Sequence, residues 1–286
     1  MKNINLVKIW SDSISEANLE RLLNDIIEYE KNINEKFIII SSGSVTLGKN
    51  KVKEKWLNIE KMLNSSLASI WQQYLMQMYD KLSKDKLVWQ VLLDDYINTN
   101  YINSFIEQVK DRKILKKFAS IILWLVSDQK DKHLAHTIWN MVKNDILVII
   151  NHNDTTSNDE LKNLSSKTDN DKNTIHITEV INKYSQEINM KIHRVIYLTN
   201  TNWLLDENKN TIIWWLVDLI EESKYWYLEY IETEKSNNWT WWMWSKVNCA
   251  FEVLEKWAFE SIIANSNTWL DCLNDEHLFS TKFKRK

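Results

Sequence analysis

Short apolar runs alternate along the chain with longer segments in which apolar residues recur at helical spacing. The apolar runs, typical of buried strands, cover residues 4–9, 36–40, 88–93, 120–126, 146–150, 193–199 and 260–264. The helical pattern covers residues 13–31, 53–82, 101–117, 130–143, 173–188 and 246–256. Strands that alternate with helices predict an α/β fold with a mainly parallel central sheet.

Polar clusters follow several of the predicted strands. In parallel sheets, ligands bind off the carboxyl ends of the strands, so these clusters predict a ligand site at that edge. The stretch 151–173 is long and polar for a plain connection, and ordered loops of that kind are often functional. The clusters lie at residues 10–11, 41–48, 151–154 and 199–203.

Two Asn/Asp clusters, at 151–154 and 169–171, belong to this polar connection, and we expect both on loops. Either cluster alone would be ordinary Asx-turn chemistry. Two clusters in one connection after a buried strand favour the positioning of a substrate or of a lysine. We expect His152 to be exposed and not to bind a metal.

Composition narrows the class of protein. The 286 residues suffice for one large or two small domains, and the formal net charge of −3 argues against a broad nucleic-acid surface. No apolar run reaches membrane-spanning length, and residues 5–10 resemble a strand rather than a signal peptide. Cys249 and Cys272 lack metal-ligand spacing, which favours a cytoplasmic protein. We expect the basic end, residues 282–286, to be solvated.

Glycine is scarce and tryptophan abundant. The chain has 2 Gly and 16 Trp, whereas ordinary usage would give about 20 glycines. With glycine for each Trp, residues 239–246 become G-T-G-G-M-G-S-K, a phosphate-binding loop that runs into a helix. Some bacterial lineages decode UGA as glycine, so we interpret most Trp positions as glycine in the living cell. The alternative is a Trp-rich stacking or membrane-interface loop.

Lys8 lies among the apolar residues of the first predicted strand. A lysine is costly to bury unless its charge is paired. The alternative is a strand that alternates between an apolar and a polar face. A phosphate loop elsewhere in the chain favours a role for Lys8 in stabilising negative charge.

With glycine at the Trp positions, the chain resembles the amino-acid kinase superfamily and, within it, glutamate 5-kinase. The resemblance runs in order through the patterns V-K-x-G-S, S-S-G-A-V-x-x-G, A-x-x-G-Q, I-I-N-E-N-D-T, D-N-D, L-T-D-x-x-G-L and G-T-G-G-M-x-T-K. The matching segments are Val7–Ser11, Ser41–Gly48, Ala68–Gln72, Ile149–Thr155, Asp169–Asp171, Leu198–Leu204 and Trp239–Lys246.

The resemblance implies a three-layer α/β/α sandwich that forms a single kinase domain over residues 1–286. Residues 1–165 would bind glutamate and 166–286 ATP, with no C-terminal PUA domain. The implied reaction is MgATP-dependent phosphorylation of the γ-carboxylate of L-glutamate, the first step of proline biosynthesis. A homo-oligomer and a functional link to glutamyl-phosphate reductase are also implied.

The resemblance also assigns roles to residues. Lys8 and Lys246 would stabilise the transferring phosphoryl group, and Asp171 would orient them. Ser42, Asp154 and Asn170 would hold glutamate. ATP would contact Lys8, Thr199, Asn200, Thr240, Trp241, Trp242, Met243, Trp244, Ser245 and Lys246.

Three positions depart from the family pattern: His152 replaces Glu, Thr168 replaces Gly, and Asn200 replaces Asp. The segment 90–129 also looks longer than usual. These departures keep two alternatives open, another kinase of the superfamily and a non-catalytic nucleotide-binding relative. A Trp-rich protein that contacts carbohydrate or membrane would leave the ordered matches unexplained.

Overall fold

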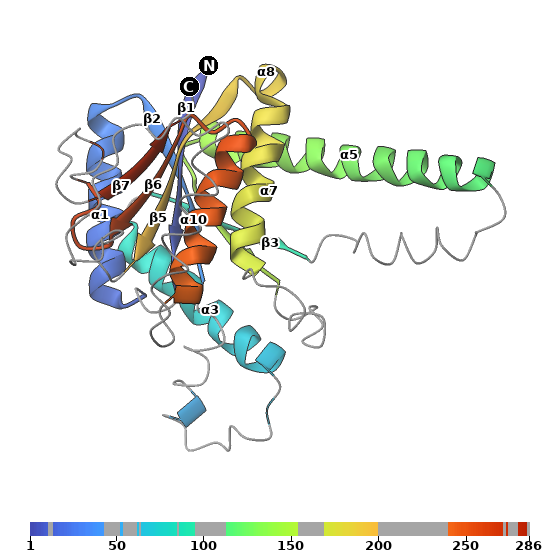
Figure 1. Ribbon diagram of the computed structural model, residues 1–286. Helices are drawn as coiled ribbons and strands as arrows, with labels where there is room; N and C mark the ends of the chain where they lie inside the picture. Colours follow the sequence, from blue (N-terminus) through green and yellow to red (C-terminus); the bar gives the residue numbers. More distant parts are fainter. Residues whose placement is uncertain are drawn as a thin grey trace.

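At the centre of the molecule, the described residues form a seven-stranded sheet in the order β3-β4-β2-β1-β5-β6-β7 (Figure 1). All neighbouring strands are parallel except β6 and β7, which are antiparallel. The strands are β1 Lys2–Ile9, β2 Glu35–Ile40, β3 Val88–Leu93, β4 Leu147–His152, β5 Met190–Thr199, β6 Glu260–Asn265 and β7 Ser280–Lys284.

The computed structural model describes residues 1–10, 14–42, 52–53, 62, 64–84, 86–94, 113–153, 169–199, 240–270, 273 and 280–284. Within these ranges, only the backbone is described for residues 64, 113–124, 169 and 240–246.

Helices cover both faces of the sheet and make three layers (Figure 1). One face packs against α1 (Glu16–Asn32) and α3 (Asn64–Leu82), and a buried apolar cluster fills that interface. A second apolar cluster fills the other face. The helices there are α5 (Lys113–Lys143), α7 (Asp169–Lys183), α8 (Ser185–Ile188) and α10 (Thr240–Glu255). This arrangement confirms the predicted three-layer α/β/α sandwich.

Alternation along the central strand β1 sets which side chains face which layer. Ile4 and Leu6 belong to the cluster under α7 and α10, whereas Val7 and Ile9 belong to the cluster under α1 and α3. Because successive side chains point to opposite faces of a strand, Lys8 continues the face of Ile4 and Leu6. The lysine therefore points toward the layer that contains α7.

Helix α1 shows how the sequence builds the layers. Its N-cap is Ser15, whose hydroxyl accepts a hydrogen bond from the backbone N–H of Asn18 at 3.2 Å. The buried residues Leu19, Leu22, Leu23 and Ile26 repeat at three- and four-residue intervals, so they form one stripe. This stripe faces the sheet, and the helix returns the chain from β1 to the parallel strand β2.

The prediction of a strand at 120–126 is wrong, because these residues lie inside the long helix α5. A short apolar run does not by itself distinguish a buried strand from a helix. Residues 113–143 contain no Gly or Pro, so nothing interrupts the helix between the run and the helical pattern that follows it.

The expectation of a solvated basic end is also wrong for Lys282 and Phe283. The strand β7 pairs with β6, and Thr281, Lys282 and Phe283 are buried. Phe283 joins the apolar cluster on the α7 face and packs against Phe251 of α10 with ring centroids 5.3 Å apart. Burial of this phenyl ring is the physical reason that the segment adds to the sheet.

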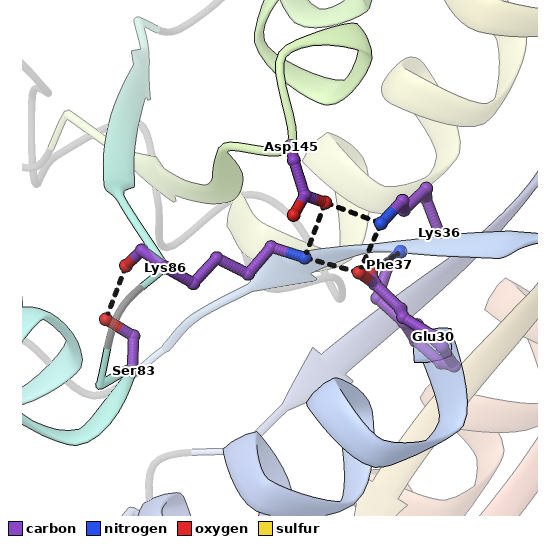
Figure 2. A network of polar contacts seen from close by, with 6 residues as sticks. All are labelled: Glu30, Lys36, Phe37, Ser83, Lys86 and Asp145. Carbon is purple, nitrogen blue, oxygen red and sulfur yellow. Dashed lines mark hydrogen bonds and ion pairs between the residues drawn. The ribbon is translucent and has the colours of Figure 1, made fainter. Parts of the chain in front are cut away.

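A network of charged side chains ties the amino ends of three strands together (Figure 2). Glu30, in the last turn of α1, forms ion pairs with Lys36 at the start of β2 and with Lys86 just before β3. Its carboxylate also accepts a hydrogen bond from the backbone N–H of Phe37 at 2.9 Å. Asp145, just before β4, contacts both lysines, at 2.5 Å and 3.3 Å.

Candidate functional site

The strand order reverses at β1, which has β2 on one side and β5 on the other. In open α/β sheets, ligands bind off the carboxyl ends of the strands at such a reversal. The helices α7 and α10 begin at this edge of the sheet (Figure 1), so their N-terminal turns and positive dipole ends face the same region. We therefore place the candidate site here, as the polar clusters in the sequence predict.

A buried ion pair marks the centre of this region. Lys8 of β1 and Asp171 in the first turn of α7 form an ion pair, and both side chains are 0% exposed. Because a buried charge is stable only when paired, each residue depends on the other. The structure thus brings together two predicted site residues and rules out the alternative that Lys8 lies on a polar, solvated face of β1.

The indole of Trp10 covers the ammonium group of Lys8. The Nζ atom lies 3.5 Å from the ring centroid, within cation–π range. Trp10 directly follows β1 and is buried. In the chain as printed, this ring occupies one of the faces by which an anion could approach Lys8.

Side-chain amides form a hydrogen-bonded chain next to the ion pair. Asn170, which precedes Asp171 in α7, donates from Nδ2 to the Oδ1 atom of Asn151 at 3.2 Å. Asn151, near the end of β4, donates in turn from Nδ2 to the Oε1 atom of Gln72 on α3 at 2.9 Å. The predicted glutamate-binding residue Asn170 is therefore joined to β4 and α3 by this chain of amides.

Ser42 follows β2 at the same edge of the sheet and is buried. Its neighbour Ser41 extends the pairing with β4, because its N–H donates to the carbonyl of Ile150 at 2.9 Å. The hydroxyl of Tyr79 donates to Ser41 Oγ at 3.2 Å, and burial raises the pKa of Tyr79 well above its usual value. These contacts fix the backbone that presents Ser42.

The part of the site expected to bind ATP is built on β5 and α10. Thr199 ends β5, is buried, and accepts a hydrogen bond at its carbonyl from the N–H of Ser266 at 2.8 Å. Residues 240–246 form the first turns of α10. The predicted residues Asp154 and Asn200 lie outside the described residues, as does the departure at Thr168.

The prediction of a loop at 240–245 is wrong for the chain as printed, because α10 begins at Thr240 rather than at Lys246. A phosphate-binding loop needs residues at positive φ, which only glycine adopts without strain. The segment 240–246 contains no glycine, and Trp, Met, Ser and Lys all accept helical dihedrals. The printed residues therefore favour a helix.

Two further expectations for the polar connection are wrong. His152 is 2% exposed rather than solvated, because β4 continues through it and pairs with Leu93 of β3. Residues 169–171 begin α7 instead of lying on a loop. Asp and Asn are favoured at helix N-termini, where their side chains interact with free N–H groups and with the helix dipole.

The sequence patterns gave no role to Gln72 or Asn151, although both lie in segments that match the family. The signal that could have found them is position. Asn151 follows four buried residues of β4, and Gln72 is a polar residue beside the buried Trp71 in α3. A buried amide at the end of a strand needs a hydrogen-bond partner, which points to Asn151, whereas its bond to Gln72 depends on how α3 packs.

Comparisons with solved structures identify the fold. No family model matches the chain, and no curated protein matches it. Carbamate kinase from Giardia lamblia bound to AMP-PNP is similar with a TM-score of 0.57 at 13% identity, over 100% of this chain and 99% of that one. Isopentenyl phosphate kinase from T. acidophilum in a product complex has a TM-score of 0.51 at 8% identity, over 99% and 100% of the two chains.

N-acetylglutamate synthase from Neisseria gonorrhoeae, complexed with coenzyme A and N-acetyl-glutamate, is also similar. Its TM-score is 0.55 at 9% identity, over 100% of this chain and 59% of that one. These three proteins are members of the amino-acid kinase superfamily. The chain has the amino-acid kinase fold. The predicted fold is thereby confirmed, whereas the narrower assignment to glutamate 5-kinase stays a prediction.

Within this amino-acid kinase fold, the described residues contain no group of three or more His, Cys, Asp or Glu side chains that could hold a metal ion. Cys249 is a buried cysteine of α10. None of the described helices is long and apolar enough to cross a membrane.

Proposed function

We propose that this protein is an ATP-dependent kinase that phosphorylates the γ-carboxylate of L-glutamate to give L-glutamyl 5-phosphate. The observation that carries the proposal is the buried Lys8–Asp171 pair at the reversal of strand order. A cation held rigidly at the carboxyl edge of an α/β sheet suits stabilisation of a transferring phosphoryl group. The kinases with the same fold support this choice of chemistry.

The proposed mechanism needs no strong general base, because a carboxylate is already a nucleophile near neutral pH. Catalysis then consists of positioning the two substrates and neutralising the charge of the phosphoryl oxygens. Lys8 supplies one positive charge, and Asp171 holds it in place. Lys246, on the second turn of α10, supplies another from the nucleotide side.

The two substrates would occupy the two halves of the carboxyl edge. Ser42, Asp154 and Asn170 hold glutamate, while Thr199, Asn200 and residues 240–246 hold ATP. The AMP-PNP bound to the Giardia carbamate kinase supports a nucleotide as the phosphoryl donor. Mg²⁺ enters with the phosphates of ATP, since it binds readily to substrate phosphates and few protein ligands.

The proposal includes glycine at most of the Trp positions, and the backbone at Trp257 supports it. Trp257 lies two residues beyond the last residue of α10, Glu255, and has φ of 67°, in the left-handed region. Its N–H bonds to Leu254 O and the next N–H, of Ala258, bonds to Val253 O, both at 3.1 Å. This pattern of hydrogen bonds ends helices with glycine at the left-handed position, and a bulky residue there is a rare exception.

Two buried tryptophans also support glycine. The indole N–H of Trp71 is buried and has no hydrogen-bond partner among the described residues, although buried Trp normally finds one. Trp10 covers the ammonium group of Lys8. Glycine at position 10 would open that face of Lys8 to a phosphate, and glycine at 71 would remove the unsatisfied donor.

Mass spectrometry of the native tryptic peptide Ser236–Lys246 tests the glycine assignment. We expect glycine at positions 239, 241, 242 and 244, because a phosphate-binding loop cannot form around four indoles. Tryptophan at these positions would contradict the kinase proposal, since the ATP site could not form there.

An assay of two proteins tests the reaction itself. The first is the printed chain. The second is the full chain with glycine at positions 10, 71, 203, 239, 241, 242, 244 and 257, here called the glycine-restored chain. We expect ADP formation that depends on L-glutamate from the glycine-restored chain, none from the printed chain, and none from a Lys8→Met variant of the glycine-restored chain.

Other outcomes of the assay separate the alternatives. ADP formation with a different carboxylate or phosphate acceptor, and not with glutamate, would identify another kinase of the superfamily. Nucleotide binding without turnover would favour a non-catalytic relative, for which the departures at His152, Thr168 and Asn200 are the motive.

The wider assignments rest on the same proposal. An acyl phosphate is a reactive product, so a glutamyl-phosphate reductase would consume it in the second step of proline biosynthesis. A homo-oligomer and a cytoplasmic location complete the proposal.

A further inference from the structure

The direction of the amide chain is fixed by a backbone group. The N–H of His152 donates to Asn151 Oδ1 at 2.9 Å. A backbone N–H cannot act as an acceptor, so Asn151 must turn its oxygen toward it and its nitrogen away. The nitrogen of Asn151 then donates to Gln72 Oε1, and the carboxamide of Gln72 is oriented in turn.

This orientation leaves Gln72 with a donor at the end of the chain. Its Nε2 atom is buried and has no hydrogen-bond partner among the described residues. A buried N–H without an acceptor is costly, and native proteins seldom leave one unsatisfied. A bound ligand that offers an acceptor atom would satisfy it.

The amide chain and the Lys8–Asp171 pair share the first turn of α7, because Asn170 belongs to one and Asp171 to the other. Gln72 reaches this region from the opposite face, on α3, by way of Asn151 on β4. The Lys8–Asp171 pair thus lies at β1 and the amide chain at β4, both at the carboxyl edge of the sheet. The strand β2 lies between them.

Glutamate has a carboxylate at each end, and only the γ-carboxylate reacts. The α-carboxylate therefore offers acceptor atoms to a buried donor at the same edge of the sheet.

We infer that Gln72 is a substrate-specificity residue whose Nε2 donates a hydrogen bond to the α-carboxylate of the bound amino acid. This inference rests on the proposed function and names the group that recognises the end of glutamate that does not react. With Lys8 at the γ-carboxylate and Gln72 at the α-carboxylate, the site contacts both ends of its substrate.

A Gln72→Glu variant of the glycine-restored chain tests the inference. The new carboxylate has the same shape and can still accept the hydrogen bond from Asn151, but it has no donor and repels an anion. We expect KM for L-glutamate to rise at least 10-fold, because hydrogen bonds to charged groups are among the stronger ones. KM for ATP and kcat should change less than 3-fold.

The matched control is Gln73→Glu, which makes the same chemical change at the next residue of α3. Gln73 is exposed. The KM of the Gln73→Glu variant for L-glutamate should therefore stay within 2-fold of the parent's KM. A rescue experiment separates recognition from structural damage. The α-amide of glutamate offers an N–H in place of an oxygen, so the Gln72→Glu variant should prefer this amide to L-glutamate, and the parent should prefer L-glutamate.

The outcomes distinguish the role of Gln72 from the proposed kinase function. If the parent uses L-glutamate and Gln72→Glu has the same KM, or fails to prefer the α-amide, the role of Gln72 is overturned and the kinase proposal stands. If the glycine-restored chain folds but forms no ADP with L-glutamate, the proposed function is overturned and the role of Gln72 with it.

Discussion

Single residues in this chain conflict with the positions that they occupy, and Trp257 shows this most clearly. Its backbone lies at φ of 67° and its side chain is 54% exposed, so it gains little from packing while the Cβ atom opposes the left-handed conformation. Asn189, at φ of 51°, ends α8 in the same conformation, but Asn tolerates it. The conflict at Trp257 comes from the residue type, not from the turn.

A Trp257→Gly substitution in the printed chain should therefore stabilise the protein. We expect a gain of about 1 kcal/mol in the free energy of unfolding, because glycine removes the cost of a Cβ atom at positive φ. Urea unfolding measures it as a higher midpoint with an unchanged slope.

The control for this prediction is Trp257→Ala, which removes the indole and keeps the Cβ atom. Alanine should give no such gain. Equal stabilisation by alanine and glycine would mean that loss of the indole, and not relief of the backbone, caused the effect.

At the site, residue types alone predicted part of the arrangement. Lys8, Ser42 and Thr199 could be placed at one edge of the sheet from their positions at or just after the ends of strands. Asn170 and Asp171 were expected on a loop of the polar connection, whereas they belong to the first turn of α7. The contacts of Gln72 could not be predicted, since they depend on how α3 lies across β4. Burial of His152 was missed because a polar residue after an apolar run usually marks the end of a strand.

Secondary-structure elements were predictable where their apolar period was clear. The strand β3 has the predicted bounds, and β1, β2, β4, β5 and β6 differ only at their ends. The long helix α5 and the strand β7 were missed for different reasons. The apolar run in α5 fits either period. The strand β7 is stabilised by pairing with β6, and its own local pattern does not show this pairing.

The charged network around Glu30 holds four elements at the amino ends of the strands (Figure 2). A Glu30→Gln substitution should destabilise the protein by about 2–3 kcal/mol, since it leaves Lys36 and Lys86 partly buried with only Asp145 to offset them. Denaturant unfolding measures this change.

The matched control for Glu30 is Glu28→Gln in the same helix. Glu28 is exposed, and substitutions at such positions change stability by less than about 0.5 kcal/mol. If both variants lost the same stability, the effect would come from the charge of the helix and not from the network.

The stability of the whole molecule should fall in acid, because Arg194 joins β5 to the adjacent strand β6 and, across β1, to β2. It contacts Glu35 of β2 at 2.8 Å and Glu260 of β6 at 3.1 Å. Burial acts to raise the pKa of Glu35, but the hydrogen bond from Asn5 and the charge of Arg194 outweigh it and hold the pKa below its usual value.

A carboxylate with a lowered pKa stabilises the folded state at pH values above the unfolded-state pKa, about 4.3 for Glu. This contribution is lost as the pH falls from there through the lower, folded-state pKa. Urea unfolding at a series of pH values should show this loss. A Glu35→Gln variant should be less stable at pH 7 and should lose less stability on acidification; an equally steep loss would exclude Glu35 as a cause.

The amide chain that ends at Gln72 has an electrostatic consequence. Its three carboxamides are aligned donor to acceptor, so their dipoles add and polarise one another along the chain. The positive end of this array is the N–H group of Gln72. Unlike a lysine or a histidine, an array of amides carries no proton that can be lost, so its attraction for an anion is the same in acid and in base.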